Sequence, residues 1–308
     1  MTKLIAIVGA TGLQGGSVLK TLYASGKYKI RALTRSKNSD KATALVEKYP
    51  DIELTEADLD NVESLRQAFS GADIVFGVTD VKSVFPRVLG GEIDAEFTQG
   101  KNIVDAAIDA GVSTIVYSSL DSASKVSGGK YTKVHHFDMK HRTEEYLRSK
   151  SDKVDSFFIH LGCYMNNFLD RACISPEDTQ TIEFHFPVEP ATLIPLVDPI
   201  NDTGPVVEYV LDHPNECQGV IYDVSGGLYE AQEVAKAFTE VTGKSARYVQ
   251  TPLESVPMVE IREMIQFTNE YGTLCGRTEF LERNKKMDYK FTTLVDFFRN
   301  NGWTGPSQ

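Results

Sequence analysis

The residues best suited to chemistry begin with a glycine-rich stretch near the start of the chain. Gly9, Gly12 and Gly15 form a G-x-x-G-x-x-G pattern between an apolar run, residues 4–8, and an amphipathic segment, residues 17–25. The first glycine permits a tight turn, the second lets the backbone approach a phosphate, and the third allows a helix to pack on a strand. The unpaired N–H groups at the start of a helix attract an anion. The pattern therefore predicts a strand, a turn and a helix that bind the pyrophosphate of a dinucleotide.

A basic segment lies about 20 residues beyond the last of these glycines, where a chain that prefers NAD carries an acidic residue. This chain has Arg35, Ser36 and Lys37 there. A guanidinium group can bind the 2′-phosphate of NADP through two charge-assisted hydrogen bonds, so the segment favours NADP over NAD. The alternative is an ordinary solvated basic turn. Asp58, after the third predicted strand, is placed to meet the adenine edge, and Thr79, after the fourth, to line the ribose and nicotinamide side.

A third group of residues lies on a helix predicted over residues 135–150. His136 and Lys140 are four residues apart, so one face of the helix carries both. Short-chain dehydrogenases place a Tyr-x-x-x-Lys pair here, in which lysine lowers the tyrosine pKa and tyrosine passes a proton. In this chain His136 occupies the tyrosine position. An imidazole can pass a proton, because its pKa is near neutrality, but an adjacent ammonium group favours the neutral ring.

Two interpretations of this helix therefore stay open. In the first, His136 and Lys140 are both catalytic. In the second, His136 packs or hydrogen-bonds structurally while Lys140 holds the cofactor ribose. Ser118 and Ser119, at the end of the fifth predicted strand, either orient substrate or cofactor or bond to the backbone.

Alternating strands and helices must position these residues. Strands are predicted at residues 4–8, 28–34, 51–56, 73–79, 112–119 and 154–161, with helices at 17–25, 40–49, 61–69, 92–110 and 135–150. This alternation predicts an α/β fold of the Rossmann type, with a doubly wound parallel sheet covered on both faces. Ligands of such sheets bind beyond the carboxyl ends of the strands.

The alternation weakens after about residue 162. Further strands are predicted at 181–186, 191–197 and 220–224, and further helices at 202–211, 230–242, 253–271 and 291–301. We therefore predict a dinucleotide-binding domain over residues 1–161 and a smaller α+β lobe over residues 162–308, with some elements of the lobe returning to the first domain. Trp303, just beyond the last helix, is interpreted as a packing anchor.

Composition and charge exclude several functions. The net charge is −11 with no basic run, so direct binding of nucleic acid is not expected. No apolar run approaches the roughly 20 residues of a membrane span, and the first strand begins too early to leave room for a signal peptide. The four cysteines are scattered, with no CxxC pair, which predicts reduced thiols rather than disulfides or a metal site. The cytosol is the expected location, with the nucleus as a second one.

Four segments resemble the NmrA-like family of atypical short-chain dehydrogenase/reductases: GATGLQGG, VYSSL, HFDMK followed by EEYL, and GCYMNNF. The resemblance covers about residues 3–250. It implies a Rossmann domain that binds a dinucleotide and lacks the usual catalytic tyrosine. It also implies a set of cofactor contacts, namely Gly9, Thr11, Gly12, Leu13, Gln14, Gly15, Arg35, Asp58, Thr79 and Lys140, with Tyr164 near the nicotinamide.

Two functions follow from these observations. The first is an NADP(H)-binding regulator, a redox sensor that acts through a protein partner and has little or no dehydrogenase activity. The substitution by His136 in an otherwise intact site motivates it. The alternative is an NADPH-dependent reductase of quinones, enones or aldehydes, because a quinone accepts a hydride and can take its proton from water. The partner would then be a small apolar electrophile. A homodimer is one option for the assembly.

Overall fold

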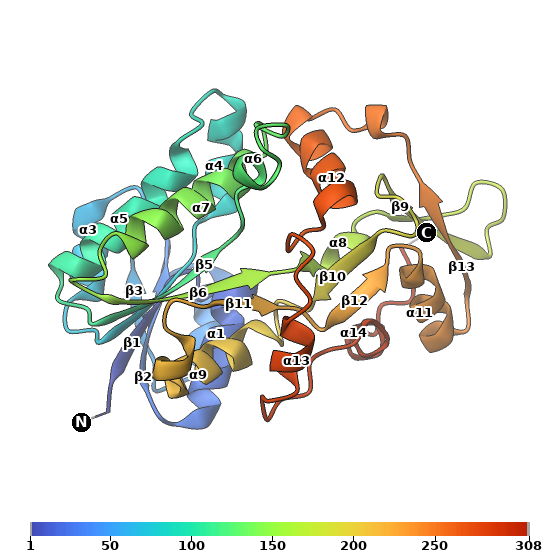
Figure 1. Cartoon of the computed structure of the whole chain (residues 1–308). Coiled ribbons are helices and arrows are strands. Elements are labelled where there is room, and N and C mark those ends of the chain that lie inside the picture. Colours follow the sequence, from blue (N-terminus) through green and yellow to red (C-terminus); the bar gives the residue numbers. More distant parts are fainter. Residues whose placement is uncertain (1, 307–308) are drawn as a thin grey trace. The chain divides into compact units, whose positions relative to one another are not determined.

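A seven-stranded parallel sheet positions the glycine turn and the other residues of the predicted dinucleotide site (Figure 1). Its strand order is β11-β6-β5-β4-β1-β2-β3. The strands are β1 (Leu4–Ile7), β2 (Lys29–Thr34), β3 (Glu53–Glu56), β4 (Ile74–Gly77), β5 (Thr114–Ser119), β6 (Asp155–Leu161) and β11 (Ile221–Val224). The order runs outward from β1 in both directions, so the sheet is doubly wound and the predicted α/β class is confirmed.

The computed structural model describes residues 2–306, which divide into two units. The first unit holds the described residues up to Ser122, together with His135–His160 and Pro199–Tyr222. The second holds Ala123–Val134, Leu161–Asp198 and the residues from Asp223 to 306. Among residues 2–306 there is no helix with both the length and the apolar character needed to cross a bilayer.

Helices cover both faces of the sheet in the first unit. They are α1 (Leu13–Ser25), α2 (Asp40–Lys48), α3 (Val62–Phe69), α4 (Val81–Leu89), α5 (Ala95–Asp109), α7 (His135–Arg148), α9 (Thr203–Asp212) and α10 (Pro214–Cys217). Helices α3, α5 and α7 lie on one face, and α1 and α9 lie on the other (Figure 1). Apolar residues of β1, β4 and β5 form a core with α3 and α5. Both faces of the central strands are therefore buried, which explains why β1 and β4 are apolar runs without alternation.

Helix α9 packs closely on α1, although the two are far apart in the sequence. The Gly204 N–H donates a hydrogen bond to the Ser17 hydroxyl over 2.9 Å. A Cβ atom at Gly204 would lie 2.3 Å from the Ser17 carbonyl oxygen, so only glycine allows this approach. The segment 199–222 thereby belongs to the first unit, and it carries both α9 and the residues that enter β11.

Helix α4 was not predicted. Pro86 lies inside it, and a proline normally ends a helix because it lacks an N–H and clashes with the preceding turn. Asp80 caps the helix by accepting a hydrogen bond from the Lys82 N–H over 3.1 Å. The cap places Asp80 at the carboxyl end of β4, beside the predicted cofactor residue Thr79.

The second unit contains two three-stranded sheets with the orders β12-β10-β7 and β13-β9-β8. Their strands are β7 (Cys163–Tyr164), β8 (Ala172–Ile174), β9 (Thr181–Phe186), β10 (Leu193–Val197), β12 (Gly227–Glu230) and β13 (Ser245–Gln250). The helices are α6 (Ala123–Val126), α8 (Asn166–Leu169), α11 (Glu233–Thr242), α12 (Val259–Tyr271), α13 (Phe280–Asn284) and α14 (Leu294–Asn301), with a 3₁₀ turn, η1 (Leu253–Ser255).

A shared apolar core joins these elements. Phe184, Phe238 and Phe298 form its aromatic centre. Trp303 packs against all three rings, with centroid separations of 5.3–6.3 Å. The prediction that Trp303 is a packing anchor is confirmed.

Candidate functional site

The glycine turn joins β1 directly to α1. Gly9 has a φ of +66°, and the Gly12 N–H donates to the Gly9 carbonyl over 2.8 Å. A Cβ at Gly15 would lie 2.3 Å from the Gly9 carbonyl oxygen, so helix and strand can touch only because Gly15 has no side chain. Gly9 and Gly15 thus have the turn and packing roles that the pattern predicts. The contact with a pyrophosphate stays a prediction.

Helix α1 begins at Leu13, four residues earlier than the sequence indicates. Its N-terminal cap is Gly12, which has no side chain to bond the first N–H groups, and its first turn holds no acidic residue. Thr11 and Gln14 are half-buried beside this end, while Leu13 is exposed. A helix N-terminus with a glycine cap and no capping side chain is suited to bind an anion, because its free N–H groups and its dipole both favour negative charge.

Arg35 and Asp80 join the carboxyl ends of β2 and β4. The Arg35 guanidinium lies 2.9 Å from the Asp80 carboxylate, and the Arg35 side chain is 65% exposed. Ser36 is also exposed, and the Lys37 N–H donates to Glu56. Arg35 is therefore accessible to a phosphate, but any such ligand competes with Asp80 for the guanidinium group. Sequence reasoning missed Asp80 because it missed the helix that Asp80 caps.

Asp58 forms a local turn after β3. Its carboxylate accepts a hydrogen bond from the Asp60 N–H over 3.0 Å, and its own N–H donates to the Ser64 hydroxyl over 3.1 Å. The residue is exposed. The structure thus places Asp58 at the carboxyl edge of the sheet, while its contact with adenine stays a prediction.

Thr79, Glu96 and Lys140 form a buried group that we call the lysine cluster. The Lys140 ammonium donates to the Thr79 hydroxyl over 2.6 Å and lies 2.9 Å from a Glu96 carboxylate oxygen. The Thr79 hydroxyl in turn donates to the same Glu96 oxygen over 2.6 Å. The side chain of Glu96 is 1% exposed and that of Lys140 is 13% exposed. Within residues 2–306, the other Glu96 oxygen is buried without a hydrogen-bond partner.

Glu96 is a second functional candidate that sequence reasoning missed. It lies in the first turn of α5, where an acidic residue is ordinarily a solvated partner of the helix dipole. In the fold its carboxylate instead faces a lysine from α7, and the neighbouring Tyr117 ring is fully buried. Burial, together with the Glu96 charge, raises the pKa of Tyr117 well above its ordinary value, so this phenol stays protonated.

His136 is half-buried on α7, one turn before Lys140, with its ring edge-on to Phe137 at a centroid separation of 4.8 Å. The Ser119 hydroxyl donates to the Lys140 carbonyl over 3.2 Å, so Ser119 bonds to the backbone of α7. Tyr164 lies on β7 in the second unit. A catalytic role for His136 and a nicotinamide contact for Tyr164 stay predictions.

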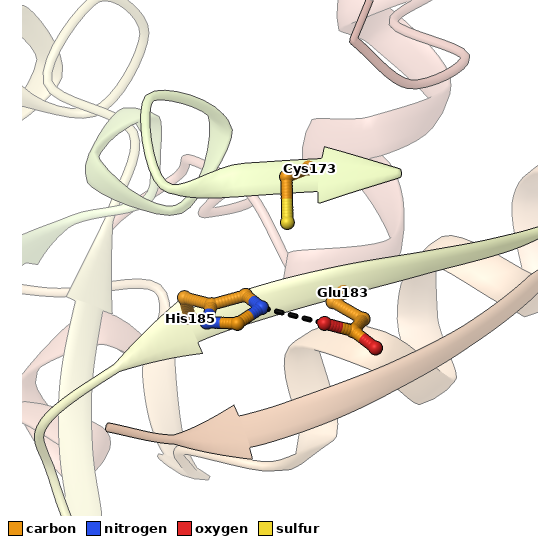
Figure 2. A group of neighbouring side chains, drawn as sticks. All are labelled: Cys173, Glu183 and His185. Carbon is orange, nitrogen blue, oxygen red and sulfur yellow. Dashed lines mark hydrogen bonds and ion pairs between the residues drawn. The ribbon is translucent and has the colours of Figure 1, made fainter. Parts of the chain in front are cut away.

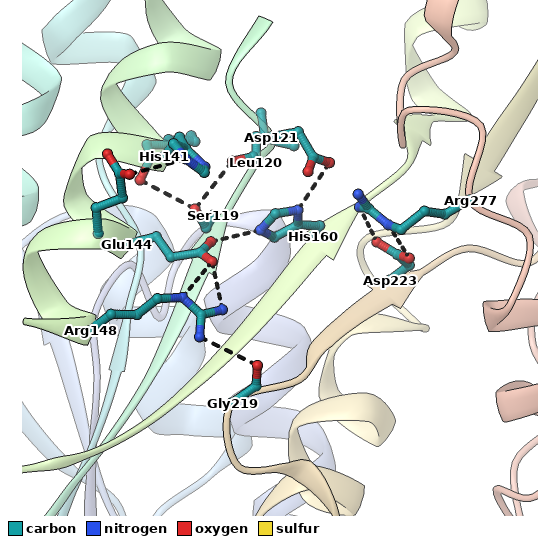
Figure 3. A network of polar contacts seen from close by, with 12 residues as sticks. Ser119, Leu120, Asp121, His141, Glu144, Arg148, His160, Gly219, Asp223 and Arg277 are labelled. Atoms are coloured by element: carbon teal, nitrogen blue, oxygen red, sulfur yellow. Dashed lines mark hydrogen bonds and ion pairs between the residues drawn. The ribbon is translucent and has the colours of Figure 1, made fainter. Parts of the chain in front are cut away.

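A second group of charged residues, the histidine cluster, includes two residues of α7. Its members are Asp121, Glu144, Arg148 and His160, and Figure 3 shows His160 between the two carboxylates. The His160 ring nitrogens lie 2.8 Å from Glu144 and 3.3 Å from Asp121, and Arg148 donates two hydrogen bonds to Glu144. Although burial opposes the charged form, the hydrogen bonds to Asp121 and Glu144 raise the pKa of His160. Burial likewise opposes ionisation of Glu144, but the bond from His160 lowers the pKa of Glu144.

Comparison with known proteins identifies the family. The model of the NmrA-like family matches residues 1–298. The chain belongs to the NmrA-like family. A curated relative, the NmrA-like family domain-containing oxidoreductase FrzB of a Cladobotryum species, is 31% identical over 316 residues, which cover 96% of this chain and 92% of FrzB. The resemblance seen in the sequence is therefore confirmed.

Solved structures share the NmrA-like fold. NmrA, a negative transcriptional regulator, in complex with NADP has a TM-score of 0.79 and 24% identity, covering 97% of this chain and 95% of NmrA. NmrA in complex with NAD has a TM-score of 0.78, at 24% identity and with 98% and 99% coverage. The NADPH-dependent quinone oxidoreductase QOR2 of Escherichia coli with NADPH has a TM-score of 0.73 and 22% identity, covering 97% of this chain and all of QOR2.

Proposed function

We propose that the first unit binds NADP(H) and that the protein is an NADPH-dependent oxidoreductase. Three features support dinucleotide binding: the glycine turn, the uncapped N-terminus of α1, and the lysine cluster beyond β4 at the same edge of the sheet. The observation that carries the proposal is the lysine cluster, whose buried Glu96 oxygen has no hydrogen-bond partner within residues 2–306. A buried polar atom without a partner is costly, which marks the cluster as incompletely bonded, and the partly exposed Lys140 ammonium is the group that a ligand can reach.

Arg35 supports a preference for the phosphorylated ribose. Its guanidinium is exposed and follows β2, where an NAD-specific protein carries a carboxylate. The ion pair with Asp80 lowers the affinity that Arg35 would otherwise have for a phosphate, because the phosphate must displace the carboxylate. The similar protein NmrA was solved with NADP and with NAD, so this likeness favours neither cofactor, and the preference proposed here rests on Arg35.

The lysine cluster would hold the nicotinamide ribose. The Lys140 ammonium has three N–H donors, of which the contacts with Thr79 and Glu96 occupy two, and its side chain is 13% exposed, so a ribose hydroxyl group can accept from the third. NADPH, when bound, supplies a hydride. Reduction of a quinone then needs a further proton, which water can provide, so a tyrosine is not required. The Glu96 carboxylate partly neutralises the charge of Lys140. Lys140 would therefore lower the pKa of a proton donor beside it less than an unpaired lysine would.

Oxidoreductase activity has the support of the relatives' names, since FrzB and others similar to this chain are named oxidoreductases. Small electrophiles such as quinones, enones and aldehydes are the substrate class we propose. QOR2, of similar fold, is named for quinone reduction.

A second candidate is a redox-sensing regulator that acts through a protein partner. It is favoured by His136 in the place of the tyrosine and by the likeness to NmrA, which is named a negative transcriptional regulator. Such a protein requires only that NADPH and NADP⁺ stabilise different conformations of the surface that binds the partner. With a net charge of −11, its partner is expected to be a protein rather than a nucleic acid.

Cofactor binding is tested with Arg35→Ala and a matched control, Lys37→Ala. Losing the charge-assisted contact should weaken NADPH binding about 10–100-fold and leave NADH binding unchanged, while the Lys37 variant should bind both cofactors nearly as the wild type does. Isothermal titration calorimetry measures the six dissociation constants, for the wild type and both variants with each cofactor. A wild-type protein that binds neither cofactor, or that prefers NADH by a wide margin, would overturn the proposal.

Activity is tested by NADPH oxidation, followed by absorbance, with a panel of quinones, enones and aldehydes. We expect turnover with at least one acceptor and its loss in Lys140→Ala. If the protein binds NADPH tightly but oxidises it with no acceptor of the panel, the oxidoreductase proposal is wrong and the regulator becomes the proposed function. A purified partner that binds only one redox state of the complex would then establish that role.

A further inference from the structure

Three potential metal ligands share one face of the sheet β13-β9-β8 in the second unit. Alternate residues of β9, namely Ile182, Phe184 and Phe186, point into the apolar core. Glu183 and His185, between them in the sequence, therefore lie on the opposite face. Cys173 of β8 pairs directly with Glu183 across the antiparallel ladder, which brings its side chain to the same face.

The ligand atoms of Cys173, Glu183 and His185 converge on a small space (Figure 2). The thiol sulfur, one carboxylate oxygen and one imidazole nitrogen all lie within 4.8 Å of one another. In a tetrahedral zinc site the bonds of about 2.0–2.3 Å separate the ligand atoms by about 3.3–3.8 Å. Small side-chain rotations on these paired strands would therefore complete the geometry.

The two oxygens of Glu183 have different partners. One accepts hydrogen bonds from the Arg247 guanidinium, at 3.0 Å from Nε and 2.5 Å from Nη2. The other lies 2.7 Å from Nε2 of His185. Hydrogen bonds from Ser175, His185 and Arg247 lower the pKa of Glu183 to about 2, so the carboxylate is charged. Arg247 thus holds one oxygen and leaves the second oriented toward Cys173 and His185, in the way that supporting bonds orient carboxylate ligands of metals.

We propose that Cys173, Glu183 and His185 bind a Zn²⁺ ion. A set of one sulfur, one nitrogen and one oxygen ligand suits zinc and excludes calcium and magnesium, which take oxygen ligands. Cys173 is exposed, so water can take the fourth position. To bind, the ion must displace the proton of the Cys173 thiol and break the hydrogen bond between His185 Nε2 and Glu183.

The site would fasten β8 to the rest of its sheet. β8 has only three residues and lies at the edge, where it pairs with β9 alone. A metal bridge between β8 and β9 would constrain the shortest strand of this sheet, and ligand binding to the folded state stabilises that state by mass action. The spacing in the sequence shows no metal motif, because strand pairing is what brings the ligands together.

The proposal is tested on the full chain with Co²⁺ as a spectroscopic substitute for Zn²⁺. We expect one equivalent of cobalt to produce a thiolate-to-cobalt charge-transfer band in the near ultraviolet, and one equivalent of zinc to abolish it. Cys173→Ser should remove the band. His185→Gln should weaken binding by more than about tenfold, the scale reached when even a supporting residue is lost. Cys275→Ser, in a half-exposed cysteine of the same unit, should keep the band.

A second measurement needs no variant. Zinc should slow alkylation of Cys173 in the wild-type protein, followed by mass spectrometry, and leave the rate at Cys275 unchanged. Absence of the cobalt band in the wild type, its persistence in Cys173→Ser, or equal alkylation of Cys173 with and without zinc would each overturn the proposal.

Discussion

Helix α7 contributes to two buried clusters of charge that differ in how fully their polar groups are bonded. In the histidine cluster, both ring nitrogens of His160 face carboxylates, Arg148 bonds to Glu144, and His160 is fully buried. In the lysine cluster, Lys140 remains partly exposed and one Glu96 oxygen lacks a partner within residues 2–306. Full bonding indicates a structural role, whereas partial bonding beside a strand end indicates a place for a ligand.

The largest effect is expected from His160→Leu. The variant removes the ring that bonds to Asp121 and to the buried Glu144, which then keeps Arg148 alone of its two cationic partners in the cluster, and this should lower the free energy of unfolding by about 3–5 kcal/mol. Urea unfolding followed by circular dichroism measures the loss. The comparison predicts an unchanged dissociation constant for NADPH at a temperature where the variant is folded. A loss below about 1 kcal/mol would contradict a structural role, since breaking a buried pair costs more.

Lys140→Met should have a smaller effect on stability and a larger one on binding. Because Lys140 is partly solvated, we expect a loss of about 1–3 kcal/mol in unfolding free energy. The same variant should bind NADPH at least about tenfold more weakly, the scale of one lost charge-assisted hydrogen bond. Glu96→Gln in the same chain should restore part of the stability and none of the affinity. If Lys140→Met loses stability but binds NADPH as tightly as the wild type does, the lysine cluster has a structural role like that of the histidine cluster.

The smallest expected effect is a change of the unfolding free energy with pH. Of the two clusters, we expect only the histidine cluster to cause it. The folded-state pKa of His160 is raised above its ordinary value of 6.5, so its stabilisation is complete below about pH 6.5 and is lost as pH rises through the folded-state pKa. The slope reaches at most about 1.4 kcal/mol per pH unit. Urea titrations from about pH 6 to about pH 9 measure it. The slope should disappear in His160→Leu and persist in Lys140→Met.

The lysine cluster also shows what sequence reasoning could reach. The sequence indicates Lys140 because its spacing from His136 fits a known catalytic helix, and its role in binding or catalysis stays a prediction. Glu96 was not found, because nothing in the sequence distinguishes a buried carboxylate in a first helical turn from a solvated one. Asp80 was missed because Pro86 disfavours a helix at this place in the sequence, although Asp80 caps one in the structure.

The two units also differ in how well their strands can be predicted from the sequence. Strands of the first unit are separated by helices, and central strands such as β1 and β4 are buried on both faces, so they have a clear local pattern. In the second unit, β13 (Ser245–Gln250) pairs in parallel with β9 (Thr181–Phe186) across about 60 residues, and β7 has only two residues. Such strands are stabilised by distant partners rather than by their own pattern, so β7, β8, β12 and β13 were not predicted.

The packing of α9 on α1 sets the order in which the protein can be completed during translation. The N–H of Gly204 reaches the Ser17 hydroxyl across 187 residues. At about 5–20 residues per second, a ribosome needs roughly 10–40 s to make that length of chain. Until then the nascent glycine turn is joined to a helix that lacks its covering neighbour, and a fragment ending at residue 161 would never acquire it.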